Sequence, residues 1–385
     1  MATAPRKCRD AFSPEIFSLV PGGLLVALAF LGGFAELTQV RISGAELTLV
    51  RSFHTASVSN SPVQSIAFDP ESNVLLLGTE DGAILEATLN GVFITILVSP
   101  VPRNSPVAGN ALAVASPLGF IYAANGGSTS PGYCQFTRSG TYLGCGAIAG
   151  FAKFVGFSFE ANDSNGVLHM LCARLPEIYS LDLTEQGFLT KLKSLSLPLD
   201  YNQRELTGLV RLPDEGLFIL SLRKGILVGV RGDPSEGPRQ VGQVLGEIDT
   251  THLGIAQVED IALDSVTRHL YVVDPVQNMV CELAFLPPRA FHRGDADQDG
   301  LSNLSDSIHL LDFLFKGGSE PKCLEAADSN NDGKIDVSDP IFLLYFLFLG
   351  GAAPPEPGPP GRACGPEPDS GDALFGLGCQ AYAGC

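Results

Sequence analysis

Two acidic stretches near the C-terminus have the residue types and the spacing of a cation-binding loop. Each spans 12 residues, 295–306 and 328–339, and the second repeats the first at an offset of 33 residues. Side chains that carry oxygen stand at positions 1, 3, 5, 9 and 12, and a glycine at position 6 permits a sharp turn. Calcium takes about six to eight oxygen ligands in an adaptable cage, with a backbone carbonyl at position 7. The two stretches therefore predict two calcium sites.

The predicted ligands follow from these positions. In the first loop they are Asp295, Asp297, Asp299, the carbonyl of Leu301, Asn303 and Asp306. In the second loop they are Asp328, Asn330, Asp332, the carbonyl of Lys334, Asp336 and Asp339. The alternative is a pair of acidic surface loops whose side chains only cap the helices that follow. Because the two loops match in register, we expect calcium, two ions, as the cofactor.

An apolar run follows each loop, at 308–315 and at 341–348, and each run ends at a glycine pair typical of a helix C-cap. This repeated loop and helix resembles a type I dockerin over residues 291–350. The resemblance implies a small α-helical module that folds on calcium and binds a cohesin domain. Position 12 is Asp where ordinary EF-hands carry Glu, and no amphipathic helix is expected before either loop. We expect the Phe and Leu faces of the two helices to form mostly a mutual core.

In dockerins the choice of partner is read largely at loop positions 10 and 11. These positions are Leu304 and Ser305 in the first loop, and Val337 and Ser338 in the second. Both pairs are more apolar than the Ser-Thr pairs of cellulosomal dockerins. The resemblance implies a partner that is a cohesin-like protein or a component of the cell surface.

The composition narrows the classes of partner. The chain has 385 residues, with 42 Asp and Glu against 24 Lys and Arg, so neither nucleic acid nor anionic lipid is an expected partner. Residues 291–385 hold 15 acidic and 5 basic residues, a net charge of −10 out of −18. A hydrophobic content of 45% excludes a disordered chain, and 43 Gly and 27 Pro with few charges favour β-structure with short connections.

Residues 36–290 repeat a pattern of short apolar runs joined by polar turns, which is typical of β-hairpins. A further strand precedes most hairpins, and equivalent positions are spaced by 45 to 53 residues: Ala67, Leu112, Phe157, Leu209 and Ala262. This period predicts a β-propeller of five or six blades. The lone strand at 46–50 is expected to pair beside residues 279–286 and close the ring. The alternative is a pair of β-sandwiches.

The strand-end patterns at 69–70 and 270–274 loosely resemble NHL-like secreted propellers. Asp69, Asp260 and Asp264 are expected to be exposed and to cap turns and strands. An alternative is that they bind a sugar or a metal in the central channel. The sequence holds no G-x-S-x-G, H-E-x-x-H or P-loop pattern.

Residues 1–35 have the features of a secretory signal peptide. Arg6, Lys7 and Arg9 precede an apolar run at 19–34, and small residues predict cleavage after Ala35. The alternative is a retained membrane anchor, although the run is shorter than the roughly 20 residues that span a bilayer. We expect a secreted or cell-surface protein without a transmembrane anchor after processing.

Cleavage would leave eight cysteines, an even number that favours disulfides in an exported protein. Cys134 and Cys145 flank a turn and are expected to pair. Two further bonds are expected in the C-terminal part, where the sequence leaves three pairings open among Cys323, Cys364, Cys379 and Cys385. Cys172 and Cys281 lie in apolar runs and fit buried thiols as well as a bridge.

The sequence thus predicts a multidomain protein: a signal peptide (1–35), an all-β propeller (36–290), the dockerin-like module (291–350) and a Pro/Gly/Cys-rich tail (351–385). The function favoured is a secreted calcium-binding protein whose propeller is a binding or adaptor domain, with a carbohydrate as one candidate ligand. The alternative is a carbohydrate-active enzyme, an O-glycosyl hydrolase or polysaccharide lyase, with paired channel carboxylates roughly 5–10 Å apart. A purely structural surface protein is the third hypothesis. No enzyme activity is favoured.

Overall fold

A computed structural model of the protein describes the propeller strands, the two acidic loops and most of the C-terminal segment. The predicted signal peptide and its predicted cleavage site lie outside the described residues. Within them, no helix is both long and apolar enough to cross a membrane. The described residues are 47–99, 107–125, 132–147, 154–162, 164–172, 176–187, 189–198, 201, 204–212, 216–232, 242–285, 289–368, 376–379 and 381–385.

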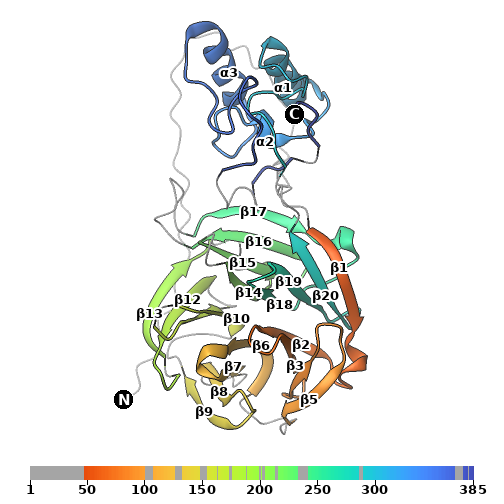
Figure 1. The fold of residues 1–385 in the computed structure, drawn as a ribbon, viewed down its shortest axis with the longest axis vertical. Coiled ribbons are helices and arrows are strands. Elements are labelled where there is room, and N and C mark those ends of the chain that lie inside the picture. The colour runs from red at the N-terminus through yellow and green to blue at the C-terminus, as the bar shows by residue number, and fades with distance from the viewer. Residues whose placement is uncertain are drawn as a thin grey trace, which may run out of the picture. The chain divides into compact units, whose positions relative to one another are not determined.

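The strands of the described residues form five antiparallel sheets of four strands each, arranged as blades around a ring (Figure 1). The innermost strands are β2 (Val63–Asp69), β6 (Val107–Ala115), β10 (Phe154–Glu160), β14 (Leu206–Leu212) and β18 (Asp260–Asp264). The second strands are β3 (Val74–Thr79), β7 (Phe120–Asn125), β11 (Val167–Cys172), β15 (Leu217–Leu222) and β19 (His269–Asp274). The third strands are β4 (Ile84–Ala87), β8 (Gly132–Thr137), β12 (Glu177–Leu183), β16 (Ile226–Arg231) and β20 (Met279–Phe285).

The outermost strands are β5 (Phe93–Val98), β9 (Tyr142–Ala147), β13 (Leu189–Ser196), β17 (Val244–Asp249) and β1 (Leu47–His54). Short 3₁₀ turns stand at Thr55–Ser57, Ser116–Leu118 and Thr251–Leu253. All five repeat positions from the sequence fall on innermost strands, so the predicted period is confirmed with five blades rather than six. The alternative of two β-sandwiches is wrong.

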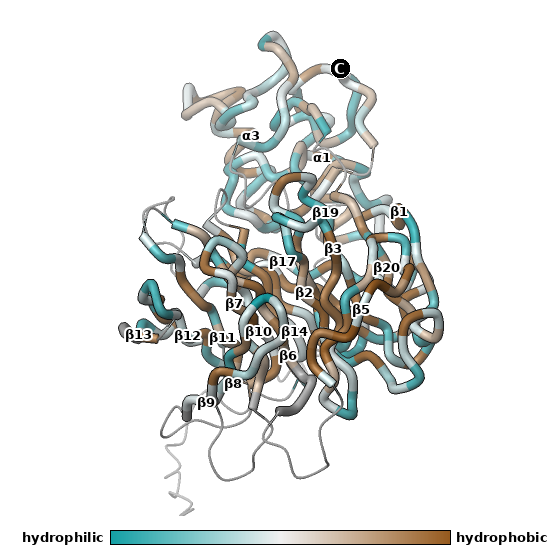
Figure 2. The backbone as a smooth tube through the Cα atoms, turned by 60° about the horizontal axis from the view of Figure 1, so that its bottom comes forward, coloured by the Kyte–Doolittle hydropathy of each residue, from teal (hydrophilic) through white to brown (hydrophobic). Residues whose placement is uncertain are grey.

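The core of the propeller lies between neighbouring blades. Ile66 and Leu77 of the first blade pack with Tyr271 and Val273 of the last, and every residue of β3 is buried. A strand that is covered on both faces reads as a continuous apolar run, which explains why the hairpin strands do not alternate cleanly. Figure 2 shows the apolar segments of β2 and β3 in brown.

The first described strand closes the ring. β1 pairs antiparallel with β20, from Leu47 opposite Phe285 to His54 opposite Met279, as the sequence predicts. Glu282 on β20 accepts hydrogen bonds from Arg51 on β1 and, at 2.6 Å, from His269 Nδ1 on β19. Because β1 completes the blade that ends the propeller, this one pairing holds both ends of the propeller chain together.

The three strand-end acids are buried, so their expected exposure is wrong. Their expected capping role is confirmed for Asp69 and Asp264, which accept from turn amides, but not for Asp260. Asp260 accepts a hydrogen bond of 3.0 Å from the backbone amide of Ile66 in the next blade. Asp69 accepts one of 2.6 Å from Ser116 and pairs with Arg138, both in the following blade. Asp264 accepts from the turn that follows it. The three carboxylates accept hydrogen bonds that link neighbouring blades and hold turns, which is a structural role.

The C-terminal module contains the two expected helices and one short helix: α1 (Leu304–Lys316), α2 (Leu324–Ala327) and α3 (Ser338–Leu349). α2 is a single turn directly before the second loop, where no amphipathic helix was expected. Leu310 of α1 and the equivalent Leu343 of α3 are fully buried. Most other Phe and Leu residues of the two helices are half-buried, but Phe315 and Phe348 are exposed, so the expected mutual core is confirmed only in part.

Three disulfides join described cysteines. Cys134 and Cys145 are direct cross-strand partners on β8 and β9, as predicted. In the C-terminal segment the bonds are Cys323–Cys379 and Cys364–Cys385, which selects one of the three pairings left open. Cys172 and Cys281 are buried free thiols.

The free thiol of Cys281 lies opposite Ser52 in the β1–β20 ladder. We expect Ser52→Cys to form a cross-strand disulfide with it, in the manner of Cys134 and Cys145. The bond should raise the free energy of unfolding by about 2 kcal/mol and the unfolding temperature by about 4–8 °C. Thermal unfolding without and with reductant measures this. The double variant Ser52→Cys/Cys281→Ser is the control, and an unbridged thiol at position 52 would contradict the described register.

Candidate metal centre

The two acidic loops have the same backbone turn. The amide of Gly300 donates to Asp295 Oδ2 at 3.1 Å, and the amide of Gly333 donates to Asp328 Oδ2 at 2.8 Å. Both glycines have positive φ, +82° and +77°, which residues with a Cβ rarely adopt. The glycine at position 6 therefore lets each loop fold back on the carboxylate at position 1.

The tip of each loop is fixed by the carboxylate at position 5. Asp299 Oδ1 accepts from the amide of Leu301 at 2.8 Å, and Asp332 Oδ1 accepts from the amide of Lys334 at 3.0 Å. Both acids are exposed. The residues at position 7 are thereby held close to the acids at position 5, as a loop with a carbonyl ligand at position 7 requires.

Position 12 belongs to the first turn of the helix that follows each loop. Asp306 Oδ2 accepts from the amide of Asn303 at 2.9 Å, and Asp339 Oδ2 accepts from the amide of Asp336 at 3.0 Å. In α1 these residues form a capping box, because Asn303 in turn accepts from the amide of Ser305. One oxygen of each carboxylate therefore caps the backbone, as the capping alternative expects. The other oxygen of Asp306 accepts from the amide of Asp297 at 3.2 Å, whereas Asp339 Oδ1 has no hydrogen-bond partner.

The acids at positions 1 and 12 are buried beyond what capping requires. Asp295, Asp306, Asp328 and Asp339 have no exposed surface. Asp295 Oδ1 and Asp339 Oδ1 are buried without a hydrogen-bond partner. Oxygen atoms of Asp295, Asp297 and Asp306 all lie within 4.8 Å of one another. A buried carboxylate oxygen without a partner is costly, and a cation among the three removes that cost.

The electrostatics of the loops follow from this burial. Burial raises the pKa of Asp306 to about 7, and Asp297 and Asp295 add like-charge repulsion in the same direction. Burial likewise raises the pKa of Asp339 to about 8, with Asp328 and Asp332 as the like charges. In each loop the carboxyl groups therefore lie so close together that ionising all of them costs free energy. A set of oxygen donors in this state suits a hard divalent cation such as calcium.

Arg293 is a buried residue of the module that the sequence did not single out. Its Nη1 donates to the carbonyls of Glu325 and Asp328, both at 3.0 Å, and its Nη2 pairs with Glu367. The side chain therefore ties the start of the first loop to the start of the second and to the tail. An arginine two residues before Asp295 is the signal that could have pointed to it.

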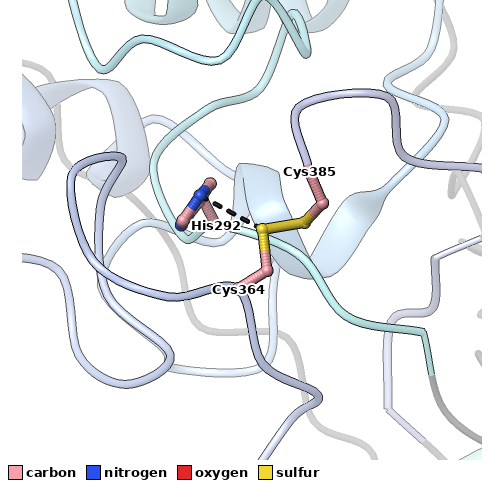
Figure 3. Close-up of side chains that lie close together, drawn as sticks. All are labelled: His292, Cys364 and Cys385. Carbon is pink, nitrogen blue, oxygen red and sulfur yellow. Dashed lines mark hydrogen bonds between the residues drawn. A yellow bond between two sulfur atoms is a disulfide. The ribbon is translucent and has the colours of Figure 1, made fainter.

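A second group of metal-ligand residue types lies at the end of the chain. Figure 3 shows His292 beside Cys364 and Cys385, with its Nε2 at 3.2 Å from Cys364 Sγ. The two sulfurs form a disulfide, and sulfur binds metals as the thiolate. The two cysteines of this group therefore serve as a disulfide bond within the tail.

The four residues predicted to select a partner differ between positions 10 and 11 of the loops. Leu304 and Val337 at position 10 are 48% and 45% exposed. At position 11 the hydroxyl of Ser305 donates to Asp297 Oδ2 at 2.6 Å, and Ser338 Oγ accepts from Asn330 Nδ2 at 2.8 Å. The serines thus support the loops from within, and the residues at position 10 are the ones open to a partner.

The central channel of the propeller contains a cavity of about 220 Å³ between the innermost strands. Glu160 is the one carboxylate among its described lining residues. It bonds to His169 at 2.9 Å and to Arg211 at 3.1 Å. Burial raises the pKa of Glu160, but these two partners outweigh burial and hold it below its usual range. The described lining therefore lacks the carboxylate pair that a glycosidase uses.

No family model and no curated protein sequence matches the chain. Among solved structures, a glutaminyl cyclase from Myxococcus xanthus is 12% identical, covering 63% of this chain and 98% of its own, with a TM-score of 0.47. The WD40 repeats of RRP9 are 9% identical over 63% of this chain and 98% of theirs, with a TM-score of 0.38. U3-55K is 10% identical over 62% and 98%, with a TM-score of 0.39.

We predict that Asp339→Asn changes stability in opposite directions without and with calcium. In chelator the folded module must either bury the Asp339 charge among like charges or protonate the carboxyl group, whose pKa is raised to about 8. The substitution removes this cost, so the free energy of unfolding of the module should rise by about 1 kcal/mol. In calcium it removes a charged ligand, so the module should become less stable than the wild type. Thermal unfolding followed by far-UV circular dichroism measures both.

The matched control is Asp312→Asn on α1, an acid outside the loops that pairs with Lys316. It should change little in either condition. If Asp339→Asn were destabilising to the same extent in chelator and in calcium, Asp339 would act only as a helix cap.

Proposed function

We propose that this protein is a secreted calcium-binding protein whose C-terminal module folds around two calcium ions and attaches the propeller to a partner protein. The observation that supports it most is the pair of matched loops with buried carboxylate oxygens that lack a partner, Asp295 Oδ1 and Asp339 Oδ1. Both loops offer only oxygen donors, at the positions that calcium loops use. The resemblance of the repeated loop and helix to a type I dockerin agrees with this proposal.

The attachment surface is proposed from exposed apolar side chains that repeat in the two helices. On α1 and at its start these are Leu304, Ile308 and Phe315, which are 48%, 54% and 69% exposed. Residues four and eleven positions apart lie on the same side of a helix. The equivalent residues 33 positions later are Val337, Ile341 and Phe348, which are 45%, 58% and 65% exposed.

Large apolar side chains that gather on one side of a helix usually mark a protein–protein contact. Two such stripes, one on each helix, give the module two similar attachment surfaces. The proposed partner is a cohesin-like protein at the cell surface, because the dockerin resemblance names that class of partner and the apolar position 10 belongs to both stripes.

The three disulfides support export, since such bonds persist in oxidising compartments. For the propeller we propose a binding role. The isolated Glu160 in the channel cavity, neutralised by Arg211, favours a ligand-binding or adaptor domain over the alternative of a glycoside hydrolase or lyase.

Isothermal titration calorimetry of the full-length protein tests the calcium sites. We expect two calcium ions per chain for the wild type and one for each of the variants Asp295→Ala and Asp328→Ala, because position 1 anchors each loop. Asp312→Ala, an acid of the same module outside the loops, is the control and should keep both ions. A wild-type protein that binds no calcium at millimolar concentration would end the proposal.

Surface plasmon resonance against a panel of cohesin domains in calcium tests the attachment surfaces. Either single variant, Ile308→Asp or Ile341→Asp, should leave one stripe intact and keep binding. The double variant should weaken binding by about 100-fold or more, because the loss of an apolar anchor at the centre of a contact costs about 2–4 kcal/mol. Calcium affinity is the control and should stay unchanged. Equal binding by the double variant would refute the surfaces proposed here.

A further inference from the structure

The end of the chain covers the first calcium loop. The hydroxyl of Tyr382 donates a hydrogen bond to Asp295 Oδ2, on the carboxylate at position 1. Gly384 lies so close that a Cβ on it would stand 2.5 Å from the same oxygen. The C-terminal strap, defined as residues 376–379 and 381–385, therefore contacts a predicted metal ligand of a loop that precedes it by more than 70 residues.

Covalent bonds hold the strap in this place. Cys379 is joined to Cys323 just before α2, and Cys385 is joined to Cys364. The ring of Tyr382 packs edge-on against His292, with 6.3 Å between the ring centroids. With a disulfide near each end of the strap, the hydroxyl of Tyr382 has little freedom to leave Asp295.

This contact distinguishes the first loop from the second. Asp295 Oδ2 accepts from both Gly300 N and Tyr382, while Asp295 Oδ1 is buried without a partner. The equivalent Asp328 accepts from two amides of its own loop, at 2.8 and 3.1 Å, and no described hydroxyl reaches it. The two hydrogen bonds on Oδ2 fix the rotation of the Asp295 carboxylate. Oδ1 therefore stays available to bind the ion.

We propose that Tyr382 is a positioning residue for the first calcium site, and that the disulfide-fastened strap makes this site tighter than it would be from its loop alone. The second site does not depend on the strap. This inference rests on the proposed function, since it concerns how one of the two proposed sites is held.

Calcium titration calorimetry of the full-length variant Tyr382→Phe tests the inference. The ring and its packing on His292 remain, and only the hydroxyl is lost. Since hydrogen bonds to charged groups are the stronger kind, we expect one of the two sites to weaken by about tenfold and the other to keep its affinity. Tyr142→Phe on β9, an exposed tyrosine of the propeller, is the control and should titrate as the wild type does.

Terbium luminescence tests separately whether an ion binds beside Tyr382. The chain has no Trp, so tyrosine is the sensitiser of a bound lanthanide, and Tyr382 touches a ligand of the first site. Terbium bound to the wild type should therefore emit on excitation of tyrosine. This emission should fall strongly in Tyr382→Phe at saturating terbium, and it should persist in Tyr142→Phe.

The double variant Cys364→Ser/Cys385→Ser tests the fastening and should weaken the same single site as Tyr382→Phe. The inference is overturned if Tyr382→Phe leaves both affinities unchanged, or weakens both equally, or if the double variant retains wild-type affinity at both sites. These results differ from failure of the proposed function, in which the wild type itself would bind no calcium.

Discussion

The repulsion among buried carboxylates is the constraint on which the C-terminal module depends. Two like charges 4 Å apart repel by about 1 kcal/mol in water and by about 4 kcal/mol where the effective dielectric constant is near 20. Asp295, Asp297 and Asp306 gather their oxygens within 4.8 Å, and burial raises the pKa of Asp306 to about 7. A divalent cation reverses the sign of this term. In the proposed account, ion binding and folding of the two loops are therefore one event.

The propeller depends on a different constraint, the closure of its ring by β1 and β20. Closure is made by backbone hydrogen bonds and by apolar packing between blades, and it involves none of the acids of the loops. Two parts of one chain thus have separate sources of stability. Disulfides add to both parts, within the second blade and within the C-terminal module.

Much of this arrangement could be predicted from the sequence because it depends on residue patterns that repeat along the chain. The 45- to 53-residue spacing of Ala67 and its equivalents predicted the blades, and the offset of 33 residues predicted two matched loops, which share the hydrogen bond from the glycine at position 6 to the acid at position 1. Other features depend on residues distant in the sequence. The role of Arg293, the pairing of the C-terminal cysteines and the contact of Tyr382 with Asp295 join segments that share no periodic signal. The exposure of Phe315 and Phe348 also escaped prediction, since apolar helices usually indicate a core.

Amide hydrogen exchange on the full-length protein tests the central claim most directly, because it follows both parts of the chain in one experiment. We expect α1 and α3 to be strongly protected in calcium and to exchange rapidly in chelator. The inner strands of the propeller, β2, β6, β10, β14 and β18, should stay protected in both conditions. Equal protection of α1 and α3 with and without calcium would contradict the account.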